Sequence, residues 1–322
     1  MRAIQIQQHG GPEVLQAADM PSPQPGPGQV LVDVAASGVN YIDTYQRSGL
    51  YPIPVPFVPG LEGAGRIVAM GEGVTGLSTG DRVGWAAAAG SYAEQAIVDA
   101  ARAIPVPDGV ADDVAAAVFL QGLTAHYLAT STYPVQQGDS VLVHAAAGGV
   151  GLLLTQIVKL RGGRVIATVS TDEKAELARA AGADEVIRYD QVDFSAETRR
   201  LTAGRGVPAV FDGVGRTTFD GSLATLRPRG IMVLYGAASG PVPPVDPQRL
   251  NSGGSLFLTR PSLVHYTGTR EELLARAGDL FGWIEAGKLD VRIGGRYPLA
   301  DARRAHEDLE GRRSTGKLLL VP

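Results

Sequence analysis

Short apolar runs alternate with longer mixed segments through the middle of the chain. Strands are expected at the apolar runs, residues 141–144, 165–169, 186–189, 209–212 and 231–235. Helices are expected at the mixed segments between them, residues 149–160, 172–181 and 219–226. Strands and helices that alternate in this way form βαβ units around a parallel sheet. The pattern therefore predicts a doubly wound α/β domain.

The segments before and after this region follow a different pattern. Short strands are expected before it at residues 2–7, 29–36 and 91–98. The Pro- and Gly-rich stretch 21–28 interrupts this part, which is typical of an irregular β-rich domain. After the α/β region, helices are expected at residues 270–286 and 301–309, followed by an apolar strand at 318–321. This tail is too short to build its own core, so we expect it to return to the first domain.

Composition excludes several functions. The chain has 322 residues, which favours two domains, and its 44% hydrophobic and 19% charged residues are typical of a globular protein. The net charge of −4 disfavours a nucleic-acid surface, which needs clustered Lys and Arg. Because there is no cysteine, disulfides, thiolate metal sites and cysteine nucleophiles are excluded. No apolar run is long enough to span a membrane, so we expect no membrane partner and a cytoplasmic location.

The segment 141–151, VLVHAAAGGVG, leads from an apolar strand through small residues into a helix. Dinucleotides bind at such a turn, because small residues let the pyrophosphate approach backbone N–H groups and the positive end of the helix. Gly148 and Gly151 match the second and third glycines of the dinucleotide fingerprint, whereas Ala146 replaces the first. The alternative is a tight turn without a ligand, but the complete βαβ unit favours the nucleotide.

The end of the next strand indicates which dinucleotide is bound. An NAD site usually has an Asp or Glu there for the ribose 2′-hydroxyl. Here the segment is STDEK, in which Ser170 and Thr171 can donate hydrogen bonds to a 2′-phosphate and Lys174 can neutralise it. Asp172 and Glu173 also suit the first turn of the following helix. We therefore predict NADPH as the cofactor, the alternative being that Lys174 is an ordinary surface lysine.

Six motifs extend this interpretation to the whole chain. They are GVNYIDTYQRSGLYP at 38–52, QGLTAHY at 121–127, HAAAGGVG at 144–151, FDGVG at 211–215, TRPS at 259–262 and AHEDLE at 305–310. In these motifs the sequence resembles the zinc-independent quinone oxidoreductases of the medium-chain dehydrogenase/reductase superfamily. The resemblance implies an α/β fold in which a GroES-like β-rich catalytic domain is interrupted by a Rossmann domain with a doubly wound parallel sheet. The expected limits are 1–122 for the first part of the catalytic domain, 123–258 for the Rossmann NADPH-binding domain and 259–322 for the return.

The resemblance also implies the site residues. The nicotinamide end is expected to be lined by Asn40, Tyr41, Ile42, Asp43, Thr44 and Tyr45, and by Tyr127 from a connecting helix. The phosphate turn would comprise Gly148, Gly149, Val150 and Gly151. The adenosine-phosphate pocket would comprise Ser170, Thr171, Lys174, Tyr189 and Arg312, with Arg313 as the alternative to Arg312. The loops near the ribose and nicotinamide would comprise Val214, Gly236, Ala237, Ala238, Ser239, Pro261, Ser262 and Leu263.

No metal site is expected. Zinc-dependent relatives need Cys and His ligands. This chain has Asn40 at the position of the first ligand and Leu61, followed by Glu62, where a His would lie. Hydride transfer without a metal suits a quinone, because the resulting anion is delocalised over the ring before it is protonated. The protein then acts by positioning the reactants and excluding water.

The implied activity is NADPH-dependent quinone reduction. Asn40 is a candidate amide donor to a carbonyl, and Tyr45 and Tyr51 are candidates for stacking and proton donation. Buried aromatic side chains with satisfied hydroxyls are the alternative for both tyrosines. Two other functions remain open, reduction of activated C=C bonds in enals or enones and a low-turnover NADPH-binding sensor or structural protein. An exposed strand within 253–258 predicts a homodimer through sheet pairing.

Overall fold

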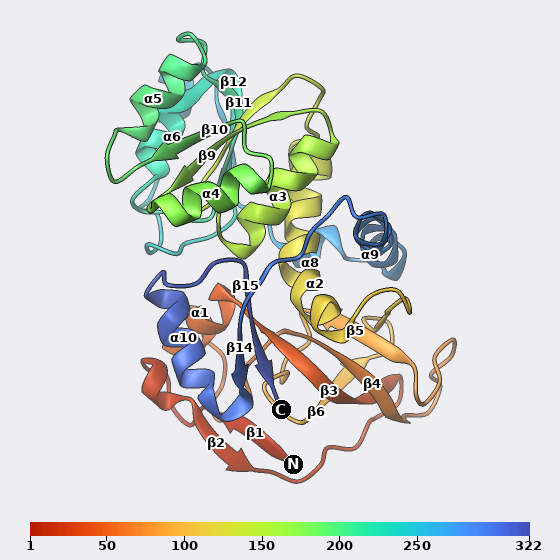
Figure 1. Ribbon diagram of the computed structural model, residues 1–322. Helices are drawn as coiled ribbons and strands as arrows, with labels where there is room; N and C mark the ends of the chain where they lie inside the picture. Colours follow the sequence, from red (N-terminus) through yellow and green to blue (C-terminus); the bar gives the residue numbers. More distant parts are fainter. The chain divides into compact units, whose positions relative to one another are not determined.

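The computed structural model describes residues 1–322 and divides the chain into two compact units (Figure 1). Unit 1 comprises Met1–Leu123 and Thr267–Pro322, and unit 2 comprises Thr124–Tyr266. The chain thus leaves unit 1 once and returns to it. Residues 259–266, which the sequence analysis assigned to the returning segment, group with unit 2 instead.

Unit 1 is built on a seven-stranded sheet with the order β14-β15-β3-β4-β5-β7, in which β6 also pairs with β3. Its strands are β3 (Gln29–Val39), β4 (Glu62–Met70), β5 (Arg82–Ala86), β6 (Gln95–Asp99), β7 (Ile104–Pro105), β14 (Ile293–Pro298) and β15 (Lys317–Val321). A separate two-stranded sheet consists of β1 (Arg2–Gln5) and β2 (Gln16–Asp19). The last strand returns to this unit as expected, since β15 pairs with β3.

The helices of unit 1 are α1 (Tyr41–Ser48), α9 (Arg270–Glu285) and α10 (Ala302–Glu310), and the limit between the units falls within α2 (Asp112–Tyr127). A short π-helix, Leu128–Thr132, follows α2. One core of unit 1 joins α10 to the sheet, since Ala302 and Ala305 pack with Val39 and Leu318. Figure 1 shows α10 beside α1. This packing carries polar side chains from both helices into the interior.

Unit 2 is a six-stranded parallel sheet with the order β10-β9-β8-β11-β12-β13. Its strands are β8 (Ser140–Val143), β9 (Arg164–Val169), β10 (Glu185–Arg188), β11 (Val207–Asp212), β12 (Leu226–Leu234) and β13 (Phe257–Thr259). Its helices are α3 (Gly149–Leu160), α4 (Asp172–Ala180), α5 (Phe194–Leu201), α6 (Phe219–Thr225), α7 (Gln248–Ser252) and α8 (Leu263–Tyr266). The doubly wound fold predicted from the periodicity is therefore confirmed.

Among the elements of unit 1 that were not expected, α1 and β14 lack a sequence signal for identifiable reasons. The buried residues of α1 are Asp43, Thr44 and Arg47, so this helix has no apolar stripe that a sequence pattern could reveal. No side chain of β14 is fully buried, so the strand has no apolar pattern, and it is defined by its backbone pairing with β15. The strand expected at 91–98 is also shorter and later, at β6, because the backbone at Tyr92 bonds to β1 instead of β3: the N–H of Ile4 donates to the carbonyl oxygen of Tyr92 at 2.8 Å. No helix of the structure is both long and apolar enough to cross a membrane.

Candidate active site

The glycine-rich turn of unit 2 has the geometry of a phosphate-binding turn. Ala145 follows β8 with a left-handed φ of 51°, and Gly148 forms the N-cap of α3. No side chain caps the first turn of α3, so its backbone N–H groups and helix dipole are available to an anion. A Cβ at Gly151 would lie 2.4 Å from the carbonyl oxygen of Ala145, so only glycine permits this approach. The turn, including Gly149 and Val150 as the first residues of α3, fits a dinucleotide pyrophosphate.

Two other loops of unit 2 follow the carboxyl ends of β11 and β12, and hydrogen bonds connect them. Asp212 Oδ1 accepts hydrogen bonds from the backbone N–H groups of Val214 and Gly215, at 2.7 and 3.0 Å. The backbone N–H and the hydroxyl of Ser239 both donate to the carbonyl oxygen of Val214 at 2.8 Å. The structure thus brings Val214 together with the loop 236–239. Their contacts with a cofactor stay predictions.

A buried polar network supports these loops. His144 Nδ1 lies 2.8 Å from Thr168 Oγ1 and His144 Nε2 lies 2.9 Å from Ser222 Oγ, which donates to Asp212 Oδ2 at 2.9 Å. Because the Ser222 hydroxyl has one hydrogen, we infer that His144 carries its proton on Nε2 and accepts from Thr168 at Nδ1. Burial lowers the pKa of His144, although Asp212 opposes the effect. The neutral ring therefore fixes Asp212 and, through it, the turn at Val214.

The residues predicted to hold the adenosine phosphate lie where β9 and β10 end. Ser170 and Thr171 follow β9, and Thr171 Oγ1 caps α4 by accepting the backbone N–H of Lys174 at 3.2 Å. Tyr189 follows β10 with 40% of its surface exposed. The structure brings these residues to the same edge of the sheet. Arg188, the last residue of β10, was not predicted as a site residue, although it lies directly before Tyr189 in the sequence.

Tyr127, predicted near the nicotinamide, contacts the last residue of α8. Its ring stacks on that of Tyr266, with centroids 4.3 Å apart and planes inclined by 6°. Tyr127 is 2% exposed, and burial raises the pKa of its hydroxyl. Pro261 is buried and Ser262 is exposed, directly before Leu263 at the start of α8. A cofactor contact of these residues stays a prediction.

In unit 1, Asn40 is buried between β3 and α1. Its backbone N–H donates to Asp43 Oδ2 at 2.8 Å, which caps the helix. Its side-chain amide donates to the carbonyl oxygen of Gly38 at 3.2 Å and to Glu62 Oε2 at 2.9 Å, and its Oδ1 accepts from Lys317 Nζ at 2.8 Å. Both amide hydrogens are therefore used within the protein. Asn40 can donate to a substrate carbonyl only if one of these bonds is exchanged.

Lys317 and Glu62 form a buried ion pair that the sequence analysis missed. Their side chains are 1% and 0% exposed, and the second carboxylate oxygen of Glu62 accepts the backbone N–H of Leu120 at 2.8 Å. A Cβ at Gly38 would lie 2.4 Å from Glu62 Oε2 and 2.5 Å from Lys317 Cε, so glycine leaves room for the pair. Burial lowers the pKa of Lys317, although the carboxylate of Glu62 opposes the effect. The only sequence signal was a lysine directly before the apolar run 318–321.

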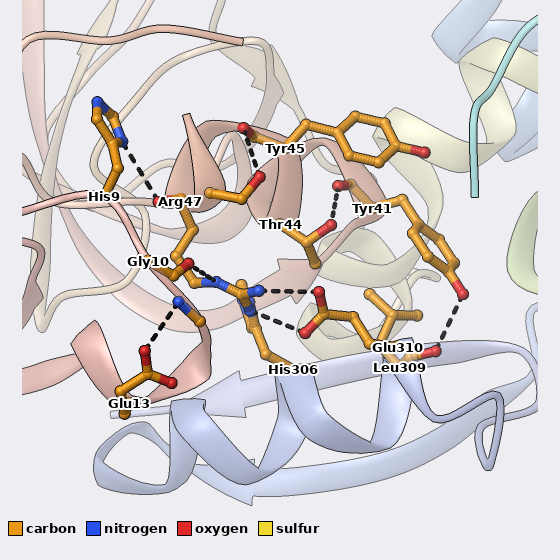
Figure 2. Close-up of polar contacts among 12 residues, drawn as sticks. His9, Gly10, Glu13, Tyr41, Thr44, Tyr45, Arg47, His306, Leu309 and Glu310 are labelled. Carbon is orange, nitrogen blue, oxygen red and sulfur yellow. Dashed lines mark hydrogen bonds and ion pairs between the residues drawn. The ribbon is translucent and has the colours of Figure 1, made fainter. Parts of the chain in front are cut away.

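Polar contacts attach α1 to α10. Arg47 Nη1 and Nη2 donate to the two carboxylate oxygens of Glu310 at 3.0 and 2.8 Å (Figure 2). Arg47 Nη1 also lies 3.0 Å from His306 Nδ1. Figure 2 shows the Tyr41 hydroxyl donating to the carbonyl oxygen of Leu309, at 3.0 Å. The side chains of Tyr41 and Arg47 thus hold the predicted nicotinamide helix inside unit 1.

A second part of this network surrounds Asp43. The Tyr92 hydroxyl donates to Asp43 Oδ2 at 2.9 Å and lies 3.0 Å from His306 Nε2. Asp43 Oδ1 is buried without a hydrogen-bond partner. Burial raises the pKa of Asp43 to about 7 and lowers the pKa of His306 to about 3. Asp43 is fully buried, and Thr44 is buried and donates to the carbonyl oxygen of Tyr41, so these two side chains stabilise α1.

Three tyrosines of the predicted substrate region contact one another. The ring of Tyr45 lies edge-on to that of Tyr51, with centroids 5.3 Å apart, and 6.3 Å from that of Tyr41. Tyr51 is 39% exposed, whereas Tyr45 and Ile42 are half-buried. The structure thus brings together the two tyrosines that were considered for stacking and proton donation. Their roles stay predictions.

Two further observations concern the remaining site assignments. The structure contains no group of three or more His, Cys, Asp or Glu side chains that could hold a metal ion. Arg313 Nε donates to Asp308 Oδ1 at 2.8 Å, and its Nη2 donates to the carbonyl oxygen of Glu307 at 3.1 Å. Arg312 has a left-handed φ of 57°. Which of the two arginines binds the 2′-phosphate stays a prediction.

Comparisons with known proteins cover the whole chain. Two family models match, one described as "Alcohol dehydrogenase GroES-like domain" at residues 26–108 and one described as "Zinc-binding dehydrogenase" at residues 149–281. A quinone oxidoreductase of Pseudomonas aeruginosa is 46% identical, covering 100% of this chain and 99% of that protein. A 2-haloacrylate reductase of a Burkholderia species is 40% identical, with 99% and 98% covered. A mycobacterial protein solved in complex with NADPH is 55% identical with a TM-score of 0.98, and both chains are covered to 100%.

Proposed function

The chain belongs to the quinone oxidoreductase family of the medium-chain dehydrogenase/reductase superfamily, and we propose that it reduces quinones with NADPH as the hydride donor. The observation that carries this proposal is the full-length similarity to quinone oxidoreductases together with the uncapped glycine turn at the start of α3. The reaction transfers one hydride, which carries two electrons, and one proton, so a quinone becomes a hydroquinone.

The cofactor would be held by groups whose surroundings suit its charges. When bound, NADPH supplies the hydride. The free N–H groups at the start of α3 would bind the pyrophosphate, and Ser170 and Lys174 would bind the 2′-phosphate.

The substrate would be positioned by the tyrosines of unit 1. The rings of Tyr45 and Tyr51 provide an aromatic surface for a flat quinone, and either hydroxyl can supply the proton. Asn40 would orient the start of α1 from within, since its amide is bound to Glu62, Lys317 and Gly38. On this proposal the residues act by orientation and by excluding water, and no step needs a strong acid or base.

Steady oxidation of NADPH by the purified protein tests the proposal. We expect turnover with a benzoquinone and a naphthoquinone, and a lower kcat for Tyr45→Phe if its hydroxyl delivers the proton. Tyr133→Phe is the matched control, since it removes a hydroxyl that is bound to Asp139 at 2.8 Å. Absence of turnover with every quinone, while NADPH still binds, would contradict the proposed activity.

Reduction of an activated C=C bond is the second candidate, because a 2-haloacrylate reductase is 40% identical over nearly the whole chain. It uses the same hydride transfer but delivers the proton to a carbon. The ratio of kcat/KM for a quinone to that for an enone or a haloacrylate separates the two. A ratio well below one would replace the first proposal with the second.

We also propose that the protein is a cytoplasmic homodimer. The strand β13 lies at the edge of the parallel sheet, and its first residue, Phe257, is 60% exposed. An exposed apolar edge strand favours pairing with a second copy. Sedimentation at several concentrations would test this, and Phe257→Lys should shift the equilibrium towards the monomer. A wild-type protein that remains monomeric at every concentration would contradict the dimer.

A further inference from the structure

Arg188 lies at the edge of the sheet where the cofactor's adenosine phosphate is proposed to bind. It is the last residue of β10 and pairs in register with Val169, the last residue of β9. The next residue along each strand, Ser170 and Tyr189, belongs to the proposed phosphate pocket. The backbone N–H of Tyr189 donates to the carbonyl oxygen of Val169 at 3.2 Å, which keeps the two strand ends together.

Two carboxylates hold the Arg188 side chain. Its Nε and Nη2 donate to the two oxygens of Asp190 at 2.9 and 2.8 Å, and its Nη1 donates to Asp172 Oδ1. The Arg188 side chain is 18% exposed, whereas the Asp172 side chain is 93% exposed. Asp190 alone already orients the guanidinium with a two-point contact. The remaining nitrogen of the guanidinium, Nη1, is thereby directed at Asp172, the first residue of α4.

The charges at this strand edge do not by themselves favour a phosphate. The segments after the two strands and the end of β10 carry three carboxylates, Asp172, Glu173 and Asp190, and two cations, Lys174 and Arg188. An acidic side chain after this strand normally selects NADH, because it accepts the ribose 2′-hydroxyl and repels a 2′-phosphate. Asp172 occupies that segment. A cation bound to Asp172 cancels this repulsion.

We propose that Arg188 determines the cofactor preference of this protein by neutralising Asp172, which lets the strand edge accept the 2′-phosphate of NADPH. The inference rests on the proposed function, since it assumes that NADPH binds here. It adds a specificity residue, Arg188, which acts through its contact with Asp172. In this arrangement Asp190 orients Arg188, and Asp172 is the carboxylate whose charge discriminates between the two cofactors.

The test is a cycle of substitutions in the full-length protein, with the Kd of NADPH and of NADH measured by fluorescence titration. Arg188→Ala should weaken NADPH binding by about tenfold, the effect of one unit charge near a phosphate dianion at an exposed site, and should leave NADH binding within about twofold. Asp172→Asn in the Arg188→Ala background should restore most of the lost NADPH affinity. Arg179→Ala is the matched control, since this arginine pairs with the exposed Glu176 on α4.

The outcomes separate this inference from the function on which it rests. An unchanged ratio of the two dissociation constants in Arg188→Ala, with NADPH still bound by the wild type, would overturn the inference alone. An equal loss of both cofactors would also overturn it, because that result shows a structural role at the end of β10. A wild-type protein that binds no NADPH would refute the proposed function and the inference together. A rescue by Asp172→Asn that is confined to NADPH would support the inference.

Discussion

Each unit contains a buried polar network, and the two networks differ in charge. In unit 1 the network includes the ion pair of Lys317 with Glu62 and a second carboxyl group, that of Asp43. In unit 2 the network passes through the uncharged Thr168, His144 and Ser222 before it reaches one carboxylate. Removing water from a charge costs several kcal/mol more than removing it from a hydroxyl. Unit 1 should therefore be more sensitive to the loss of a single partner and to pH.

The two networks have one feature in common, a buried carboxylate that holds a predicted site segment. Each holds a segment that is proposed to bind a reactant: Asp212 accepts the backbone N–H of Val214, and Glu62 accepts the side-chain amide of Asn40. Both acceptors are fully buried. A buried acceptor fixes a flexible loop more firmly than an exposed one, because water does not compete for the hydrogen bond. The units thus use different chemistry for the same structural task.

The largest expected effect comes from breaking the ion pair of unit 1. Lys317→Met should lower the free energy of unfolding by about 3–5 kcal/mol, because it leaves Glu62 as an unpaired buried charge. Urea denaturation of the full chain measures this loss. Lys159→Met is the control, since Lys159 pairs with Asp184 at the surface and should cost about 1 kcal/mol or less. Equal losses in both variants would remove the distinction between the buried and the exposed pair.

A smaller effect is expected where the pair is crowded rather than broken. Gly38→Ala should cost about 1–3 kcal/mol, because the new Cβ would meet Glu62 and Lys317 at 2.4 and 2.5 Å. Thermal unfolding and urea denaturation both report this change. Gly278→Ala in α9 is the matched control. A Cβ added at Gly278 would meet no atom within 4 Å outside its own helix backbone, and alanine should stabilise the helix by about 0.5–1 kcal/mol. A neutral Gly38→Ala variant would show that the ion pair has room to move.

The pH dependence of Asp43 offers a third way to test the network of unit 1. Its pKa is raised from 3.8 to about 7 on folding. Its contribution to the free energy of unfolding is therefore full below pH 3.8 and is lost as the pH rises through about 7. Asp43→Asn removes this loss, so the free energy of unfolding of the variant should rise by about 2–3 kcal/mol relative to that of the wild type as the pH goes from about 5 to about 8. Urea denaturation at the two pH values measures the difference.

His306 has the opposite pH dependence to Asp43. Its pKa is lowered from 6.5 to about 3, so its contribution is present above pH 6.5 and is lost as the pH falls towards 3. Because this effect opposes that of Asp43, the two must be separated by comparing variant and wild type at each pH. A difference between Asp43→Asn and wild type that does not vary with pH would show that Asp43 does not titrate in this range.

The smallest effect is expected in the neutral network of unit 2. Thr168→Val removes the hydroxyl that donates to His144 Nδ1 and should cost about 1–2 kcal/mol, the penalty for one unsatisfied acceptor. Urea denaturation on the same scale as Lys317→Met gives the comparison. A loss as large as that of Lys317→Met would mean that the neutral network is as sensitive as the charged one.

Much of the fold followed from local patterns. The alternation of apolar runs with helical segments predicted the parallel sheet of unit 2, and α3 begins and ends at the expected residues, 149 and 160. The glycine turn could also be identified from the sequence, because a dinucleotide turn needs small residues at a few consecutive positions. By contrast, α1 was missed because it buries Asp43, Thr44 and Arg47, and sequence periodicity detects apolar faces only.

The sequence by itself determined the local chemistry: a strand–turn–helix with room for a pyrophosphate, a Ser–Thr–Lys segment after the next strand, and no cysteine. Tertiary structure decided how polar groups are paired. Lys317 meets Asn40 because β15 pairs with β3, and Arg188 meets Asp172 because β10 pairs with β9. Pairing register joins residues that are far apart in the chain, and neither the composition nor the spacing around one partner specifies the other. The physical reason is that a buried charge is tolerated only where the fold supplies its partner.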